Sequence, residues 1–211
     1  MTSRSDCHVG IGRGSTLDAA LPAPMQEHVD RRRTDTRRRL RAIALELFTQ
    51  QGYELTSLTQ IAGRAGVTRQ ALLHHFASKE ELLTESYEEL LPALDELIDG
   101  ASVSPGGLTH QQVVDRFDAL ARGEHGATLV CAHVTEHALR GLPAARTLQR
   151  KLTELTEVLA TDDTPEGRMR GRLAVAAVVM AVVRPRELSG RRTQRHDAAR
   201  AVARSLLGAE L

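Results

Sequence analysis

The segment at residues 57–76, SLTQIAGRAGVTRQALLHHF, decides how we expect the chain to fold. Its first serine, with Gln60 three positions later, forms the capping-box pattern that opens a short helix. Gly66 then supplies a helix stop, and Thr68 supplies the cap of a second helix that we expect to reach the end of the segment. Because only two residues separate these helices, the spacing predicts a helix-turn-helix unit.

Amphipathic helices are predicted on both sides of this unit. Over residues 35–51 the apolar side chains recur at the spacing of one helical face, and Gly52 follows as a stop. On the other side, Ser78 with Glu81 forms a second capping-box pattern, at the start of a helix that we expect to reach Ile98. Four helices are therefore expected up to that residue.

The rest of the chain also has a helical period, and no run alternates apolar with polar residues over the length of a strand. We therefore expect an all-α protein of nine helices. The run from Leu173 to Val183 is apolar on every side, so its own domain or another subunit must enclose it. The five further helices are expected at residues 109–121, 126–139, 143–160, 165–183 and 193–207.

Composition excludes several classes of protein. Of the 211 residues, 41% are hydrophobic and 26% are charged, as in ordinary globular chains, which excludes a wholly disordered or fibrous protein. The longest apolar run is about half as long as the roughly 20 residues of a membrane-spanning helix, and no secretory signal opens the chain. The two cysteines, Cys7 and Cys131, lie too far apart in sequence to indicate a disulfide framework or a zinc site. We expect a cytoplasmic protein.

Positive charge is concentrated in one stretch, although the formal net charge is only +1. Residues 31–41 contain seven arginines and one aspartate. Arginines beside a helix-turn-helix can neutralise DNA phosphates without reading bases, and a solvated helix face explains the arginines of residues 37–41 equally well. We expect Arg31, Arg32 and Arg33 to contact DNA.

The residues that carry these three arginines are expected to be irregular. Up to residue 33 the chain shows no helical period, and it contains several glycines and prolines with few clustered apolar residues. We therefore predict a flexible basic N-terminal arm over residues 1–33.

Residues 37–83 resemble the TetR family of bacterial transcriptional regulators. The resemblance is carried by the stretches RRRL, ALELF, GYELTS, IAGRAGVT and HHFASKEELL. It implies a three-helix DNA-binding unit, a helical domain for effector binding and dimerisation, and release of operator DNA when a small molecule binds. The expected domains are the arm at 1–33, the helix-turn-helix DNA-binding domain at 34–80 and the effector-binding and dimerisation domain at 81–211.

The resemblance also implies roles for single residues. Thr68 would cap the recognition helix and contact a phosphate, and Lys79 would reach the DNA backbone. Arg69 and Gln70 would face the major groove, where arginine can pair with guanine and glutamine with adenine.

This chain departs from the family pattern at two positions. Family members usually carry a phosphate-contacting tyrosine where this chain has Leu73, and often a small residue where it has Gln70. Leucine cannot donate a hydrogen bond, so we expect His74 to take over the phosphate contact. Partial burial against Phe76 is the alternative interpretation of His74, and the favoured one for His75.

A competing motif lies in the second half of the chain. His133, Glu136 and His137 match the H-x-x-E-H pattern of inverzincin metallopeptidases, with two imidazoles one helical turn apart. So short a pattern is weak support, and no feature marks a third protein ligand, although Glu154 or Glu157 is conceivable. We favour solvent-facing or pocket-lining polar residues and keep a metal-responsive regulator or a zinc hydrolase as the alternative.

The functional prediction follows from these patterns. No phosphate-binding loop, nucleophile elbow or dinucleotide fingerprint occurs, so we expect neither enzymatic activity nor a cofactor. We predict a homodimeric DNA-binding transcriptional regulator, a repressor that a small-molecule effector releases from a pseudo-palindromic operator in double-stranded DNA. With only five aromatic residues in the chain, a small or aliphatic effector is favoured over a large cationic drug. Expected pocket residues are Phe117, Leu129, His133, His137 and Leu152.

Overall fold

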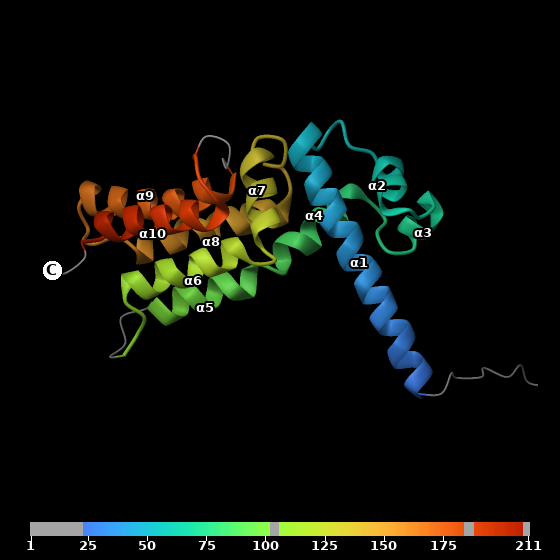
Figure 1. Cartoon of the computed structure of the whole chain (residues 1–211), viewed down its shortest axis with the longest axis horizontal. Helices are drawn as coiled ribbons and strands as arrows, with labels where there is room; N and C mark the ends of the chain where they lie inside the picture. The colour runs from blue at the N-terminus through green and yellow to red at the C-terminus, as the bar shows by residue number, and fades with distance from the viewer. Residues whose placement is uncertain (1–22, 102–105, 184–187, 209–211) are drawn as a thin grey trace, which may run out of the picture. The chain divides into compact units, whose positions relative to one another are not determined.

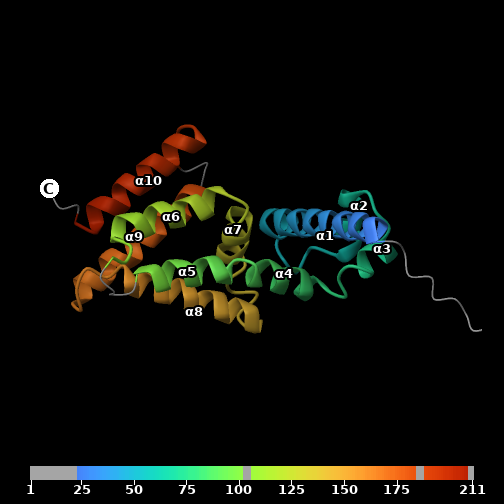
Figure 2. The same cartoon turned by 90° about the horizontal axis from the view of Figure 1, so that it is seen from below.

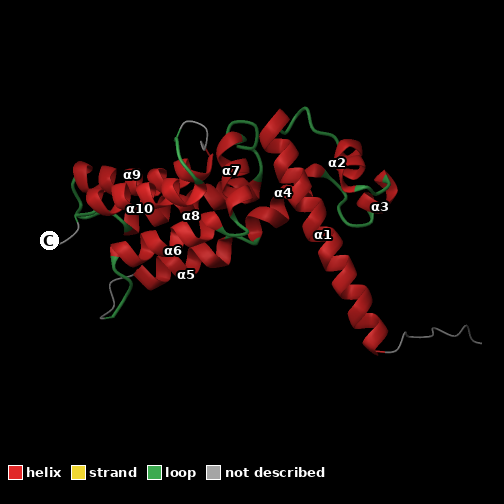
Figure 3. Cartoon of the chain, in the orientation of Figure 1, coloured by secondary structure: helices red, strands yellow, loops and turns green. Residues whose placement is uncertain are grey.

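The computed structural model describes residues 23–101, 106–183 and 188–208, and side chains from Thr34 onwards. Within these ranges the chain forms helices and no strand, which confirms the all-α class (Figures 1 and 3). The helices are α1 (Ala23–Gln51), α2 (Leu58–Ala65), α3 (Arg69–Leu73), α4 (Lys79–Glu88), α5 (Leu91–Ala101), α6 (His110–Arg122), α7 (Gly126–Val134), α8 (Pro143–Val158), α9 (Pro165–Val183) and α10 (Arg192–Leu206).

Each of the nine predicted helices is present, but the one expected between residues 78 and 98 is interrupted. It consists of α4 and α5, separated by a turn at Glu89 and Leu90. Pro92 explains the break, because proline lacks an N–H group and its ring clashes with the carbonyl four residues earlier, here that of Glu88. The part of the chain that the structure describes therefore holds ten helices.

Helix α1 begins at Ala23, well before the predicted start at Asp35. The expectation of a flexible arm up to residue 33 is therefore wrong for residues 23–33, and its remainder, 1–22, lies outside the described residues. The prediction relied on an apolar period, which this stretch lacks. Extending an existing helix needs no such face, because the costly step is nucleation and each added residue gains a hydrogen bond. The chain divides into two compact units, residues 1–35 and residues 36–211.

Helix α7 ends at Val134, five residues before the predicted end at Leu139. Thr135 caps it with φ −101° and ψ 8°, outside the helical region, and a series of turns comes next. The Thr135 hydroxyl donates to the carbonyl of Cys131 at 2.6 Å, the same carbonyl that accepts from its own N–H. Such a local side-chain bond competes with regular helix continuation.

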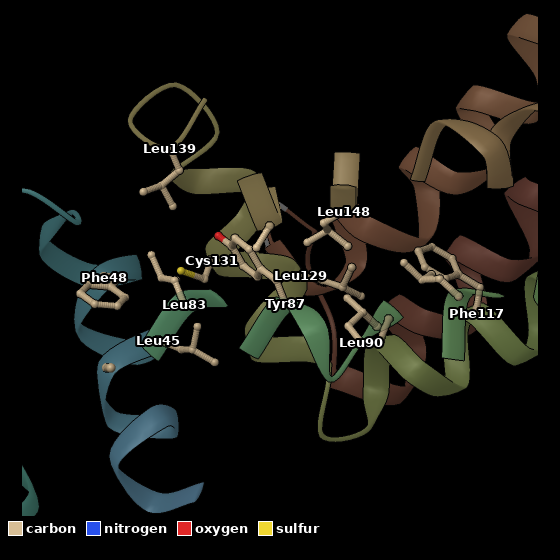
Figure 4. Packing of buried hydrophobic residues seen from close by; sticks show 14 of the residues in the cluster. Leu45, Phe48, Leu83, Tyr87, Leu90, Phe117, Leu129, Cys131, Leu139 and Leu148 are labelled. Carbon is tan, nitrogen blue, oxygen red and sulfur yellow. The ribbon is translucent and has the colours of Figure 1, made fainter. Parts of the chain in front are cut away.

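The core of the second unit is one cluster of buried apolar side chains. In Figure 4, Leu45 and Phe48 of α1 lie beside Leu83 of α4, and Tyr87 lies beside Cys131 of α7. Farther along the chain, α5 runs beside α8, and α9 packs on α10 and α6 (Figure 2). No helix in the described ranges combines the length and apolar character needed to cross a bilayer.

A buried hydrogen-bonded pair of polar side chains links α6 to α10. Asp118 is 0% exposed and His196 is 1% exposed, and their side chains lie 2.6 Å apart from Oδ1 to Nδ1. Arg122 and Arg200 lie within 3.0 Å and 3.5 Å of the other carboxylate oxygen. A buried carboxylate needs such partners to offset its lost hydration, so this cluster sets the relative position of the two helices.

Candidate nucleic-acid interface and ligand cavity

Helices α2 and α3 form the predicted helix-turn-helix. The Ser57 hydroxyl accepts from the Gln60 N–H at 3.2 Å, and the Gln60 side chain accepts from the Ser57 N–H at 2.8 Å, which completes the capping box. Gly66 follows α2 with φ 71°, a left-handed conformation that glycine adopts without strain. Leu72 of α3 is fully buried and anchors the second helix.

The surface of α3 presents polar side chains to solvent. Thr68 caps the helix by accepting from the Ala71 N–H at 3.0 Å, which leaves its own hydroxyl proton for another acceptor. Arg69 and Gln70 are exposed on the first turn, and His74 is exposed at the C-terminal cap. The helix is a turn shorter than predicted, because the chain turns at His74 and buries Phe76.

Lys79 has a structural role in this unit. Its ammonium group donates to the carbonyl of Tyr53 at 2.8 Å and lies 4.3 Å from the centre of the Tyr53 ring. These contacts fasten the start of α4 to the turn that comes after α1. The expected backbone contact with DNA would have to use the remaining ammonium protons.

The arginines that precede the unit divide into two groups. Arg37 donates through Nε to both carboxylate oxygens of Glu85, at 2.9 and 2.7 Å, and its guanidinium lies 4.2 Å from the centre of the Phe76 ring. Arg41 is buried and pairs with Glu85 at 3.2 Å and also with Glu89. The hydrogen bond to Glu85 raises the pKa of Arg37. These two arginines therefore join α1 to α4.

The other arginines of the basic stretch have no such partners on α4 within the described residues. Arg38 and Arg39 are exposed on α1. The side chains of Arg31, Arg32 and Arg33 lie outside the described residues. Arg37 and Arg41 both face α4 because residues four apart share one face of a helix, whereas Arg38 and Arg39 lie on other faces.

A cavity of about 980 Å³ lies among α4, α7, α8 and α9. Its buried wall is apolar and comes from four helices and the turn after α7, with Tyr87, Leu129, Leu139, Leu148 and Val175 as members. In Figure 4, Leu129, Leu148 and Tyr87 come together from separate elements. The size is at the upper end of the roughly 300–1,000 Å³ typical of small-molecule sites.

The cavity wall contains Leu129, His133 and Leu152 of the five expected residues. Phe117 is not part of it. That side chain is 1% exposed within the core, because the face of α6 that carries it packs on other helices. His137 is also outside the wall, since its side chain is exposed in the turn after α7, with Nε2 3.2 Å from Nη2 of Arg140.

We define the polar mouth of the cavity as the exposed charged and amide side chains in its wall. They come from the turn after α7, the first half of α8 and the middle of α9. The members are Glu136, Arg140, Arg146, Gln149 and Arg172. Sequence patterns did not point to the three arginines or to Tyr87, because no periodicity or spacing connects them; only Tyr87, one of five aromatic residues, stands out in the sequence.

The structure removes the basis of the metal-site alternative. His133 lies on α7, whereas Glu136 and His137 lie beyond its end, so the three do not share one helical face. Across the described ranges, no three His, Cys, Asp or Glu side chains are grouped in a way that could hold a metal ion. Cys131 is fully buried, and burial raises the pKa of its thiol to about 11.

The sequence of the helix-turn-helix region is similar to that of known transcriptional regulators. Residues 40–85 match the family model described as bacterial regulatory proteins, tetR family. The HTH-type transcriptional regulator AcrR of Shigella flexneri is 48% identical over 54 residues, 26% of this chain and 25% of that protein. TcmR of Streptomyces glaucescens is 33% identical over 141 residues, 64% of this chain and 57% of that protein. The chain thus spans between a quarter and about three fifths of the length of these relatives.

Solved structures resemble the chain over a greater length. PfmR of Thermus thermophilus, a TetR-family regulator, is 25% identical with a TM-score of 0.56 and covers 80% of this chain and 97% of its own. KstR2 of Mycobacterium tuberculosis, a ketosteroid transcriptional regulator, is 19% identical with a TM-score of 0.61, covering 83% and 93%. The all-helical fold and its turn-linked α2 and α3 define a helix-turn-helix protein. Together with the sequence matches, they show that residues 40–85 carry the TetR-family segment and that the described chain has a fold similar to that of TetR-family regulators.

Proposed function

We propose that the protein is a transcriptional regulator that binds double-stranded operator DNA as a homodimer and releases it when a small molecule enters the cavity. The observation that carries this proposal is the exposed polar start of α3 behind the Gly66 turn, with Thr68, Arg69 and Gln70 on it. A second helix presented in this way fits the major groove. Residues 34–80 would form the DNA-binding domain, and residues 81–211 the effector-binding and dimerisation domain.

Some residues would recognise the base sequence, and others would add affinity for the DNA backbone. Arg69 and Gln70 would meet base edges, where a bidentate contact discriminates between bases by about 1–3 kcal/mol. Thr68 and His74 would contact phosphates, as their exposure at either end of α3 supports. Lys79 would add a smaller contribution, since its ammonium group already binds the Tyr53 carbonyl.

Arg31, Arg32 and Arg33 would add phosphate contacts on the N-terminal side of the unit. They belong to the helical backbone of α1 rather than to an irregular arm. Substitution by alanine should flatten the slope of log affinity against log salt by about 0.9 for each phosphate contact that it removes. An unchanged slope in the triple alanine variant would remove these residues from the interface.

Dimerisation would use the outer faces of α9 and α10. Met169 and Leu173 of α9 and Val202 of α10 are large apolar side chains that remain about half exposed and lie outside the cavity wall. The two helices pack on each other, and we propose that these exposed residues belong to one apolar surface. A second copy related by a two-fold axis would cover it and would place two recognition helices on a pseudo-palindrome. Leu173→Glu should then give a monomer by light scattering, whereas a wild-type monomer would contradict the proposed assembly.

Effector release needs a connection between the cavity and the DNA-binding unit, and α4 supplies one. Its first residue, Lys79, is bound to the Tyr53 carbonyl, and Tyr87 near its last turn is in the cavity wall. Arg37 and Arg41 tie its acidic face to α1. A ligand that favours a different position of Tyr87 would therefore shift α4 and the recognition helix together, provided that it binds the two conformations with different affinity.

The proposal is tested by selection from a library of random-sequence DNA duplexes with the full chain. We expect enrichment of an inverted repeat. Absence of any enriched sequence would contradict the proposed function. Such a regulator works where the chromosome is, so the proposal also places the protein in the cytoplasm.

Fluorescence anisotropy with the enriched duplex and a random duplex then separates readout from affinity. Gln70→Ala should weaken binding to the enriched duplex by about 1–3 kcal/mol and leave the random duplex almost unchanged. Arg116→Ala is the matched control, because Arg116 is exposed on α6, away from the helix-turn-helix. Equal weakening on both duplexes would mean that Gln70 does not read sequence.

A further inference from the structure

The mouth of the cavity collects positive charge from three separate elements. Arg140 lies in the turn after α7, Arg146 in the first turn of α8 and Arg172 on α9, and all three are exposed. Glu136 is the only carboxylate in the cavity wall among the described residues. The mouth therefore has an excess of positive charge, although the chain as a whole is nearly neutral.

None of these three arginines is paired with a carboxylate of the described residues. Arg140 Nη2 lies 3.2 Å from His137 Nε2, and the side chains of Arg146 and Arg172 make no hydrogen bond or ion pair with the described residues. By contrast, Arg37 and Arg41 each contact carboxylates of α4.

Arg146 is also in an unfavourable place on its own helix. The N-terminus of a helix carries a partial positive charge, which favours anions and disfavours cations. Helix α8 has Leu142 as its N-cap, with no side-chain hydrogen bond and no acidic residue in the first turn. Ala145 and Arg146 of that turn are both in the cavity wall. A bound anion would therefore relieve the repulsion between Arg146 and the helix end.

The interior of the cavity is aliphatic and uncharged. Leu129, Leu148 and Val175 are buried in its wall, and Tyr87 is the only aromatic residue of the described chain there. The Tyr87 hydroxyl lies 3.5 Å from Thr135 Oγ1, and burial raises its pKa, so it stays neutral. A single buried ring offers no aromatic cage for a cation, and the arginines at the mouth would repel one.

We propose that the ligand of this cavity is an aliphatic carboxylate, with its hydrocarbon chain in the apolar interior and its carboxylate held at the mouth by Arg140, Arg146 and Arg172. Planar guanidinium groups match a carboxylate through paired, charge-assisted hydrogen bonds. Burial of the chain supplies affinity at the same time. The inference rests on the proposed function only in that it names the effector.

The test uses isothermal titration of the full-length protein with dodecanoate, below its micelle concentration. Dodecyltrimethylammonium and dodecanol are the charge controls, since they carry the same chain with a cationic or a neutral head. Arg172→Gln and Arg146→Gln should each weaken dodecanoate binding by about tenfold, the effect of removing one charge-assisted hydrogen bond. Arg168→Gln is the matched control, because Arg168 is exposed on α9 one turn earlier and is not in the cavity wall.

The expected result is binding of dodecanoate, much weaker binding of both other compounds and unchanged binding by Arg168→Gln. Absence of dodecanoate binding, equal affinity for the cationic or neutral compound, or unaltered affinity in both Arg172→Gln and Arg146→Gln would overturn the inference. Melting curves by circular dichroism are the folding control for the variants, which are all at exposed positions.

DNA binding is measured separately with the enriched duplex. A protein that binds this duplex but not dodecanoate refutes the ligand inference and leaves the proposed function intact. A protein that binds dodecanoate but no DNA refutes the proposed function alone. Where both hold, dodecanoate should lower the affinity for the duplex in the wild type and much less in Arg172→Gln.

Discussion

Between Ser57 and Lys79, a side chain caps the start of every helix, whereas α7 and α8, two of the helices around the cavity, have no side-chain cap. Ser57, Thr68 and Ser78 each cap the helix that comes after them. His125 precedes α7 and Leu142 precedes α8 as their N-cap residues, and neither makes a side-chain cap. The helix-turn-helix unit is thus specified locally, and the cavity is specified by packing between distant segments. Substitutions should therefore affect the two regions differently.

The largest effect is expected in the core of the DNA-binding unit. Phe48 is fully buried, with its ring 5.1 Å from that of Tyr53. Phe48→Ala should lower the free energy of unfolding by about 3–5 kcal/mol, because it removes buried surface and leaves a void in a packed region. Urea denaturation followed by circular dichroism measures the change. A loss below about 1 kcal/mol would mean that this unit is loosely packed.

A smaller loss is expected for a side chain of similar burial in the cavity wall. Leu148 is 2% exposed but faces space that is already empty. Leu148→Ala should cost about 2–3 kcal/mol, at the low end of the range for buried leucine, because the leucine has fewer atoms packed around it. The same denaturation experiment applies. A cost equal to that of Phe48→Ala would remove the distinction between a packed core and a binding cavity.

The charged connection between α1 and α4 should contribute less than either core position. Glu85→Gln removes the ion pairs to Arg37 and one of those to the buried Arg41, which keeps Glu89. We expect a loss of about 2 kcal/mol, the range for hydrogen bonds to charged groups. Arg150→Ala, which breaks an exposed pair with Glu154, is the control and should change stability by at most about 1 kcal/mol. Equal effects would contradict a connecting role for Glu85.

The last effect is expected from the buried thiol behind the cavity, and it is absent at neutral pH. Burial raises the pKa of Cys131 to about 11 from 9.0, so the unfolded chain loses this proton at lower pH than the folded one. Stability should therefore fall as pH rises from about 9 to 11, by no more than about 1.4 kcal/mol per pH unit. At pH 7 and below the thiol is protonated in both states and has no effect.

The measurement is the difference in unfolding free energy between the wild type and Cys131→Ala at pH 8, 9, 10 and 11. Tyr53, whose pKa burial raises to about 12, titrates in both proteins and cancels in the difference. A difference that does not depend on pH would show that Cys131 is accessible to solvent.

The same comparison explains how much could be predicted from the sequence. The turn at Gly66 and the caps at Ser57 and Thr68 were predictable, because their partners lie within four residues. The end of α7 was not, because it depends on how Thr135 is seated in the core.

Some residues of the candidate site could also be predicted from local sequence, and others could not. Exposure of Arg69 and Gln70 follows from the period of α3, so sequence patterns find them. The meeting of Arg140, Arg146 and Arg172 depends on the packing of α7, α8 and α9, which has no counterpart in local sequence. Phe117 was misplaced for the same reason, because an apolar residue suits a core and a cavity wall equally well.

Helix α9 has one face in the cavity and another at the apolar surface proposed for the second copy. Val175 and Val179 are in the cavity wall, whereas Met169 and Leu173 are exposed. With the proposed dimer in place, a ligand that changes the position of this helix would also change the dimer dissociation constant, and by thermodynamic linkage the ligand's affinity would depend on protein concentration. Titrations carried out on a dilution series would then give different apparent constants, with the monomer and the dimer behaving as two distinct receptors for one compound.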